Sequence, residues 1–314
     1  MRKKFVVYFH KLNLAADPFS SYGDKRSVYH DLFRKGIARG HEMYLASGKE
    51  NSLGNFSFAN TFRYNGTSFE PQAEIIQADA VYDRSGGTSF PTEALSRKTL
   101  NNRVFKLLCN NKNATKKLLH DFMPKNYVVM SSEELQDRLL EFDTTALAVL
   151  KPSKGMCGKG VIIDTPANLA SAAIETGVEY ALQEFVDTSR GIPGITDTHH
   201  DLRIIIVNGE VLLVHVRTPK AGSLLANVAQ GGSIREVLLE NIPAFIMEAV
   251  QKIQKIVDTT FDFPLYSIDF GIQNGDTAFV FELNDQIGFP SDTMTASSAF
   301  VEGILDSLEL RATL

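Results

Sequence analysis

The chain is poor in cysteine and has no long hydrophobic run, and each absence narrows the class of protein. Its two cysteines, Cys109 and Cys157, form neither a metal-binding nor a redox spacing. No apolar stretch approaches the ~20 residues that cross a membrane as a helix. The apolar run in the basic start, MRKKFVVYFH, is too short for a signal peptide, and no small-residue cleavage site follows it. We therefore expect a reduced, cytoplasmic protein without a membrane partner.

The chain also has fewer basic than acidic residues. The 32 Lys and Arg residues are outnumbered by 37 Asp and Glu residues, which gives a net charge of −5. A general nucleic-acid-binding surface needs a basic face, so we expect no nucleic-acid partner, although a local basic pocket for phosphates stays open. With 314 residues, of which 44% are hydrophobic and 22% charged, the chain can form one to three globular domains.

The first hundred residues alternate strand and helix, which favours a parallel, doubly wound α/β layer. The expected elements are a helix over 27–40 and strands over 4–10, 42–47 and 80–87. A mostly helical segment, 100–123, leads from this layer to the rest of the chain.

From about residue 127 the pattern becomes α+β and rich in antiparallel strands. Asn208-Gly209 and Asn274-Gly275 each join two apolar runs, and Asn-Gly is a strong signal for a hairpin turn. The expected helices are 132–142, 167–176 and 243–257, and the expected strands are 126–130, 146–152, 161–165, 180–186, 201–209, 210–218, 266–272 and 278–284.

Acidic and amide side chains interrupt two adjacent apolar runs, YSIDFGI and AFVFELN. Glu282 and Asn284 are two residues apart and share a strand face, and the hairpin brings Asp269 beside them. Unpaired acidic groups are costly to bury, whereas a hard cation such as Mg²⁺ takes oxygen ligands of this kind. The alternative is a pair of hydrogen-bonded strands without a metal.

A glycine- and lysine-rich segment between two expected strands is the second informative feature. It runs from Lys151 to Val161 and holds three lysines and three glycines. Glycines let the backbone approach a ligand, and backbone N–H groups with ammonium groups suit a polyphosphate. It is not a Walker A loop, because Gly160 follows Lys159 where Ser or Thr would stand. The alternative is a flexible surface hairpin with solvated lysines.

The order of the polar motifs is more specific than any one of them. Taken alone, Asp201-Leu202-Arg203 fits a structural salt bridge. The ordered motifs are Lys112, Lys151 with the glycine-rich segment, Gln183-Glu184-Phe185-Val186, Asp201-x-Arg203, Arg217, Asn227 before two glycines, Asp269 and Glu282-x-Asn284. In this order, over roughly residues 105–290, the chain resembles the ATP-grasp superfamily. It is most similar there to bacterial glutathione synthetases and to RimK-type ligases that add glutamate to a ribosomal protein.

The resemblance implies an ATP-grasp fold joined to an N-terminal α/β layer. We place a substrate domain at 1–104, a central and lid subdomain at 105–186, and a C-terminal subdomain at 187–314. ATP would lie between the two α+β lobes with two Mg²⁺ ions, which Mn²⁺ can replace. The implied ATP-binding residues are Lys112, Lys151, Lys154, Gly155, Gly158, Gln183, Glu184, Phe185, Val186 and Asp201, and the implied metal ligands are Asp269, Glu282 and Asn284.

The reaction that the resemblance implies is an ADP-forming carboxylate–amine ligation. A carboxylate attacks the γ-phosphate of ATP, and an amine then attacks the acylphosphate to form an amide or peptide bond. Arg203, Arg217 and Asn227 are the implied catalytic residues. Small metabolites, amino acids and peptides all fit as substrates, and relatives are often homodimers or homotetramers. The alternatives are an ATP-grasp phosphotransferase without an amine acceptor and a non-catalytic ATP-binding regulator.

Four further positions bear on the substrate. Arg84 and Ser85 follow a strand whose carboxyl end is where doubly wound layers bind ligands, so we predict a substrate role for both. A helix-capping or interdomain contact is the alternative for Arg84. The resembled ligases usually carry an arginine where this chain has Leu225. They carry a small residue where it has Asp285, whose charge we expect near the metals or facing an amine substrate.

Overall fold

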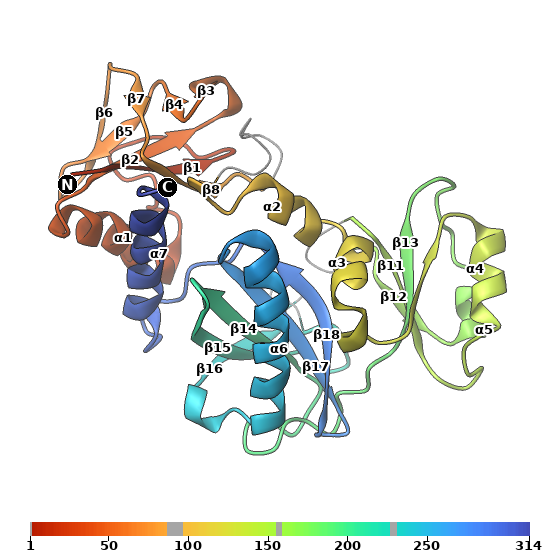
Figure 1. Ribbon diagram of the computed structural model, residues 1–314. Helices are drawn as coiled ribbons and strands as arrows, with labels where there is room; N and C mark the ends of the chain where they lie inside the picture. The colour runs from red at the N-terminus through yellow and green to blue at the C-terminus, as the bar shows by residue number, and fades with distance from the viewer. Residues whose placement is uncertain (1, 87–96, 155–158, 227–230) are drawn as a thin grey trace.

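The computed structural model describes residues 2–86, 97–154, 159–226 and 231–314, and these residues form four sheets. In Figure 1 an N-terminal layer, a five-stranded sheet and a small four-stranded sheet follow one another across the molecule. Helices α2 (Arg103–Cys109) and α3 (Lys112–Leu119) link the layer to the small sheet. Among the described helices, none combines the length and apolar character that crossing a membrane requires.

The N-terminal layer has a parallel core. Its sheet has the order β6-β5-β2-β1-β8-β9, and β1 pairs in parallel with both β2 and β8. The strands are β1 (Lys4–Phe9), β2 (Glu42–Ser47), β5 (Phe62–Tyr64), β6 (Phe69–Pro71), β8 (Ala80–Arg84) and β9 (Thr99–Leu100). The predicted strands and the helix α1 (Arg26–Ala38) are therefore confirmed.

The two faces of this layer are covered differently. Alternate residues of β1 face α1 and α7 (Ser297–Arg311) on one side, as Phe5 and Val7 do. Val6 and Tyr8 face a small antiparallel sheet instead. That sheet consists of β3 (Ser52–Gly54), β4 (Ser57–Phe58) and β7 (Ile76–Gln77). A doubly wound layer would have helices on both faces. Here the segment before β8 forms short strands, and positive φ angles at three of its residues, Asn55, Phe56 and Asn60, limit their length.

The small four-stranded sheet is antiparallel, in the order β10-β13-β11-β12. Its strands are β10 (Asn126–Val129), β11 (Ala148–Pro152), β12 (Ile162–Asp164) and β13 (Tyr180–Glu184), with the helices α4 (Ser132–Leu139) and α5 (Pro166–Leu169). The predicted helix over 167–176 is wrong, because α5 ends after one turn. Thr165 supplies no side-chain cap, and the β-branched Ile174 and Thr176 favour extended backbone.

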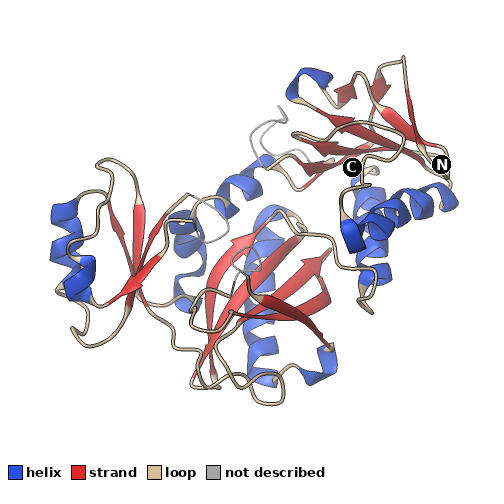
Figure 2. Ribbon diagram, turned by 180° about the vertical axis from the view of Figure 1, so that it is seen from behind, coloured by secondary structure: helices blue, strands red, loops and turns tan. Residues whose placement is uncertain are grey.

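The five-stranded sheet is also antiparallel, in the order β16-β15-β14-β17-β18. Its strands are β14 (Asp201–Val207), β15 (Glu210–Thr218), β16 (Ser233–Val237), β17 (Tyr266–Gln273) and β18 (Thr277–Asn284). Both predicted Asn-Gly hairpins are confirmed, with positive φ at Asn208 and Asn274. Helix α6 (Ala244–Phe261) packs on one face through a large apolar cluster and leaves the other face for polar side chains. Figure 2 shows this sheet from behind, with α6 beyond it.

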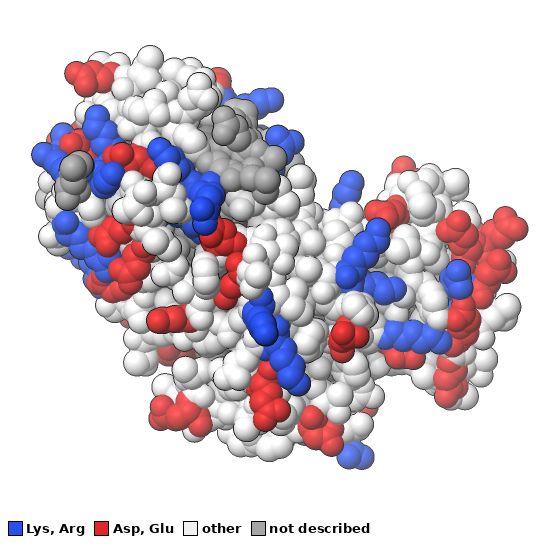
Figure 3. Space-filling model, in the orientation of Figure 1, with Lys and Arg blue, Asp and Glu red and all other residues white. Residues whose placement is uncertain are grey.

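Short 3₁₀ turns complete the described structure at η1 (Gly23–Lys25), η2 (Lys49–Asn51), η3 (His120–Phe122) and η5 (Leu239–Asn241). On the face drawn in Figure 3, basic and acidic side chains are interspersed over the N-terminal layer and the five-stranded sheet.

Candidate active site

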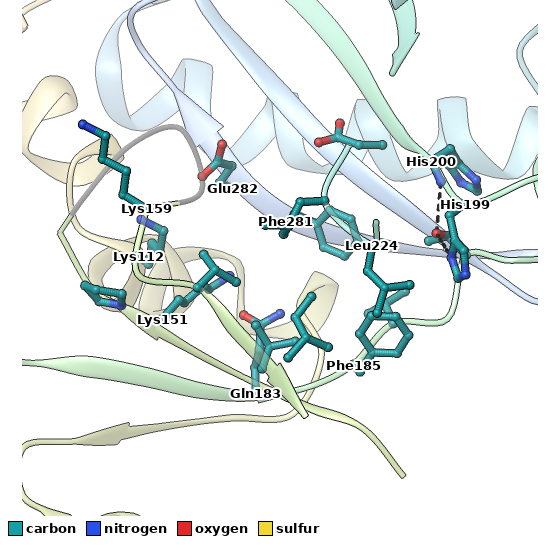
Figure 4. Close-up of a pocket in the computed structure, with 18 residues that line it drawn as sticks. Lys112, Lys151, Lys159, Gln183, Phe185, His199, His200, Leu224, Phe281 and Glu282 are labelled. Carbon is teal, nitrogen blue, oxygen red and sulfur yellow. Dashed lines mark hydrogen bonds between the residues drawn. The ribbon is translucent and has the colours of Figure 1, made fainter. Parts of the chain in front are cut away.

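A cleft lies between the four-stranded sheet and the five-stranded sheet (Figure 4). Its empty space is about 960 Å³, and strands β11 and β13 face β18 across it. Half of the residues that line it are apolar, and these suit a flat aromatic ring system. The apolar lining residues are Val149, Pro152, Val161, Ile163, Phe185, Val186, Leu224, Leu225 and Phe281.

Three lysines and one glutamate gather at one end of this cleft (Figure 4). Lys112 begins α3, directly after the capping residue Asn111, and Lys151 lies near the end of β11. Lys159 and Glu282 complete the group. Because ammonium groups and helix N-termini both attract anions, this end of the cleft suits phosphate groups.

Burial lowers the pKa of the two inner lysines, Lys112 and Lys151. Lys151 is only 8% exposed, and burial lowers its pKa to about 8. The carboxylate of Glu282 opposes this shift, and the ammonium of Lys112 adds to it. Burial lowers the pKa of Lys112 as well, again opposed by Glu282. A bound polyphosphate would favour the charged form of both lysines, so their charge responds to occupation of the cleft.

The predicted segment from Gln183 to Val186 divides between the cleft and solvent. Gln183, Phe185 and Val186 line the cleft, whereas the side chain of Glu184 is exposed and lies outside it. The Oε1 atom of Gln183 is buried and has no hydrogen-bond partner among the described residues. An unsatisfied buried acceptor is costly, which makes this atom a candidate for contact with a ligand donor.

Part of the predicted set is not brought into the cleft. Lys154 is exposed and lines neither this cleft nor the neighbouring cavity. Gly155, Gly158 and Asn227 lie outside the residues that the structure describes, so their roles stay predictions.

A row of polar side chains crosses the five-stranded sheet on the face opposite α6. The register pairs Glu282 with Asp269, Asp269 with Arg203, and Arg203 with His215. Residues directly opposite each other in antiparallel strands share a face, so all four project to the same side. Asn284 donates from Nδ2 to both Asp269 Oδ2 (3.1 Å) and Glu282 Oε1 (3.3 Å). The predicted convergence of three oxygen-bearing side chains is therefore present in the structure.

Asp269 is the centre of this row and is fully buried. Arg203 donates to it from Nε (2.7 Å) and from Nη2 (2.5 Å), and Arg217 donates from Nη2 (2.7 Å). Burial would raise the pKa of Asp269, but the two guanidinium groups hold it well below its usual range. The two predicted catalytic arginines are thus fixed side by side by one carboxylate.

Asp201 is the second acid in contact with these arginines. Arg217 donates to its Oδ2 atom, while Oδ1 has no hydrogen-bond partner among the described residues. Burial and the charge of Asp269 raise the pKa of Asp201 to about 7, against the opposing effect of Arg217 and Arg203. Asp201 pairs with Arg217 rather than with Arg203, and it lines the cleft, so its predicted contact with ATP stays a prediction.

A second, larger cavity adjoins the cleft, and its empty space is about 1660 Å³. Lys112 and Glu282 line both, so the two meet at the lysine-rich end. The polar face of the five-stranded sheet forms one wall, and η1 and residues 285–294 form others. Sequence reasoning missed two residues that line this cavity, His215 on the sheet and Lys25 in η1. His215 lies two residues before Arg217 on one strand, so its direction could have been read from that spacing.

The donor set fits a hard cation at Glu282 and Asn284, which both line the larger cavity with oxygen-bearing groups. Both carboxylate oxygens of Asp269 accept from arginine, which leaves Asp269 fewer lone pairs for an ion than a free carboxylate has. No three His, Cys, Asp or Glu side chains among the described residues have a metal-binding arrangement, so the amide of Asn284 would be needed.

Arg84 lies at the contact between the N-terminal layer and the segment after β18, outside both cavities. Its guanidinium donates to the hydroxyl of Tyr29 (3.2 Å) and to the carbonyl of Ile287, and it lies over the ring of Phe289. These contacts agree with the interdomain alternative. Ser85 is buried beside Arg84, and the substrate roles of both stay predictions.

Comparison with known proteins supports the resemblance. Residues 111–258 match the model of the prokaryotic glutathione synthetase ATP-grasp domain. A probable alpha-L-glutamate ligase from Maridesulfovibrio salexigens is 30% identical over 110 residues, which is 34% of this chain and 34% of that protein. The aligned stretch is therefore about a third of the relative's own length.

Solved structures of similar fold cover almost the whole chain. The D-alanyl-alanine synthetase A of Vibrio cholerae has a TM-score of 0.65 at 12% identity, over 100% of both chains. A peptide-bound, RiPP-associated ATP-grasp ligase of Chryseobacterium gregarium has a TM-score of 0.62 at 14% identity, over 98% of this chain and 97% of that one. A RimK domain ATP-grasp protein of Sphaerobacter thermophilus has a TM-score of 0.58 at 14% identity, over 97% and 99%. The chain therefore has the ATP-grasp fold, and over residues 111–258 it matches the ATP-grasp domain of prokaryotic glutathione synthetases.

Proposed function

We propose that the protein is an ATP-dependent, ADP-forming carboxylate–amine ligase. The observation that carries this proposal is the meeting of the two cavities at Lys112 and Glu282. A nucleotide whose base lies against the apolar walls would extend its phosphates toward the lysines. Its terminal phosphate would then face the larger cavity, where a carboxylate substrate has room to bind.

The chemistry has two steps. A carboxylate oxygen of the acid attacks the γ-phosphorus of ATP, an O–P bond forms, and the bond from that phosphorus to the β-bridging oxygen breaks as ADP leaves. The amine nitrogen then attacks the acyl carbon. A C–N bond forms, the C–O bond to phosphate breaks, and the amine proton is lost. Activation is needed because a free carboxylate is a poor acyl donor.

The described residues supply position and charge for both steps. Lys112, Lys151 and Lys159 offset the charge of the phosphates at the end of the cleft. Arg203 and Arg217, held by Asp269, present guanidinium groups to the larger cavity, where a developing oxyanion would be stabilised. Glu282 and Asn284 would hold Mg²⁺, which supplies further charge neutralisation to the phosphates when bound.

The relatives indicate the kind of substrate. Their names describe a D-alanyl-alanine synthetase, a probable glutamate ligase, and a ligase in complex with a leader and core peptide. We infer that the acid and the amine of this protein are amino acids or peptides. The larger cavity opens to solvent, and with that opening its empty space is about 1660 Å³, which accommodates either.

The decisive experiment is ADP release with ATP and Mg²⁺ against a matrix of acids, amino acids and short peptides, with mass spectrometry of each reaction. ADP together with a product one water lighter than acid plus amine is the expected result. ADP with only a phosphorylated product would establish the phosphotransferase instead. ATP binding without ADP release in any reaction would favour the regulator.

A further inference from the structure

The larger cavity extends beyond the groups assigned to the reaction. Arg203, Arg217, Glu282 and Asn284 lie on the sheet wall, the end of α2 and the start of α3 contribute Cys109, Asn110 and Lys112, and η1 and residues 285–294 bound the remaining side. A substrate that fills this space presents groups that are remote from the activated carboxylate. The side chains on the remaining wall therefore decide which of those groups are accepted.

Lys25 is the cation on that remaining wall. It ends η1 in the N-terminal layer, and a Cβ placed on Gly288 would lie 3.8 Å from its Nζ atom. The ammonium group is therefore next to the segment that follows β18, at the edge of the cavity. No ion pair or hydrogen bond of this ammonium is present among the described residues, whereas Arg203 and Arg217 are both paired with carboxylates.

His215 lines the same cavity from the sheet. It is 7% exposed, and its Nδ1 atom has no hydrogen-bond partner among the described residues. Burial lowers the pKa of His215 to about 3, and the charges of Arg203, Arg217 and Lys25 contribute, with Asp269 opposing. The imidazole is therefore neutral and keeps one N–H donor for a ligand.

We propose that Lys25 and His215 form a second anion subsite, which binds an oxyanion of the substrate remote from the activated carboxylate. The ammonium supplies charge and the imidazole supplies one directional hydrogen bond. A side-chain carboxylate and a phosphate share this chemistry. The proposal rests on the proposed function, because that reaction defines which carboxylate is activated. Asp24 lines the same cavity beside Lys25, and its charge opposes binding of an anion.

Binding calorimetry on matched probes tests the subsite without relying on turnover. The probes are L-glutamate against L-glutamine and O-phospho-L-serine against L-serine, each with a non-hydrolysable ATP analogue and Mg²⁺ present. We expect the anionic member of one pair to bind about tenfold tighter than its neutral partner. The pair that shows the preference distinguishes a carboxylate from a phosphate.

Three variants locate the preference. Lys25→Gln should lower it about fivefold or more, and because Lys25 is exposed, folding should be unaffected. Asp24→Asn should maintain or increase it. Lys49→Gln, an exposed lysine of the corresponding turn η2, is the matched control and should leave it unchanged. Equal binding within both pairs, no binding of any probe, or a full preference in Lys25→Gln would overturn the proposal.

Failure of the subsite can be told apart from failure of the proposed function. If the wild type releases ADP and forms an amide but Lys25→Gln keeps the full preference, only the subsite is wrong. If the wild type releases no ADP with any acid, the ligase proposal fails. The calorimetric preference still decides the subsite in that case.

Discussion

Two clusters of buried charge use the same ion-pair chemistry but differ in how completely their atoms are satisfied. The junction cluster consists of Lys106, Asp83 and Asp285, where the N-terminal layer, α2 and the segment after β18 meet. Lys106 is 0% exposed and donates to the carbonyl of Asp83 (2.9 Å) and to Asp285 Oδ2 (3.1 Å). Gln286 donates to the same carboxylate oxygen (2.7 Å). Asp285 is therefore paired with a lysine, and it also lines the larger cavity beside Glu282 and Asn284, so its expected place near the metals or an amine stays a prediction.

The sheet cluster consists of Asp201, Arg203, Arg217 and Asp269. We call it open, because some of its buried polar atoms have no hydrogen-bond partner among the described residues. Oδ1 of Asp201 and Nε of Arg217 are buried without a hydrogen-bond partner among the described residues. No atom of the junction cluster is in that condition. Asp201 of the sheet cluster lines the cleft, and Arg203 and Arg217 line the larger cavity. The atoms without partners therefore belong to residues that face these two spaces.

The comparison separates structural from functional use of buried charge. In a closed cluster, such as the junction cluster, no buried side-chain polar atom among the described residues lacks a hydrogen-bond partner, and the cluster orders the elements that it joins. An open cluster keeps bonds for a ligand and is costly until the ligand binds. Breaking the first should reduce stability, and altering the second should reduce activity.

The largest effect should come from removing the cation of the junction cluster. Lys106→Met leaves Asp83 and Asp285 buried without a counter-charge, which costs about 3–5 kcal/mol of unfolding free energy. Urea denaturation measures this loss. Lys117→Met, on the exposed side of α3, is the matched control and should stay within about 0.5 kcal/mol of the wild type. A loss below about 1 kcal/mol in Lys106→Met would show that the ion pairs of the junction cluster do not stabilise the fold as proposed.

The next effect should be on catalysis at the edge of the sheet cluster. Glu282→Gln removes the carboxylate shared by both cavities, and we expect ADP formation to fall about 10²-fold or more. The unfolding free energy should change by less than about 1 kcal/mol, because Glu282 is only half-buried. Glu210→Gln, an exposed glutamate at the start of β15, is the control. Turnover like that of the wild type would remove Glu282 from the site.

A third, smaller effect concerns pH. Lys151 has a pKa lowered to about 8, so in the free protein it is charged below that pH and neutral above it. ATP affinity should therefore fall as the pH rises above about 8, by at most about tenfold per pH unit. Titration calorimetry from about pH 7 to about pH 10 measures it. Lys151→Arg keeps its charge over this range and should abolish the inflection, and an unchanged profile in that variant would contradict the assignment.

A fourth effect should appear in the stability of the open cluster. The pKa of Asp201 is raised to about 7 in the folded protein, against about 3.9 in an unfolded chain. Its ionised form therefore destabilises the fold progressively as the pH rises from about 4 to about 7. The unfolding free energy of Asp201→Asn relative to the wild type should increase over that interval. A difference that is the same at both ends would show that Asp201 does not titrate there.

The sequence predicted those parts of the site that strand spacing determines. Glu282 and Asn284 share a face because they are two apart, and the Asn274-Gly275 turn sets Asp269 opposite them. The lysines could not be placed by spacing, because Lys112 and Lys151 lie on different elements. Only the order of the motifs and the resemblance brought them together.

Other features were beyond such reasoning, because they depend on which elements become neighbours. Arg203 pairs with Asp269 since β14 lies beside β17, and Asp201 is left to Arg217 on β15. Lys25 is far from the site in sequence and enters it through tertiary packing alone. Helix α7, in contrast, was missed although the apolar spacing from Phe300 to Leu308 is helical.

Helix α7 has a consequence for the order in which the molecule assembles. It lies against α1 and β8 of the N-terminal layer, where Arg39 forms ion pairs with Glu302 and Asp306. The part of that sheet's apolar face that α1 does not cover stays uncovered until residues 297–311 are synthesised, although the strands are made first. During synthesis the N-terminal layer therefore lacks α7 while the two sheets of the cleft emerge from the ribosome and fold. A chaperone that shields β1 and β8 during this interval would protect these early strands until a helix almost three hundred residues after β1 has been synthesised.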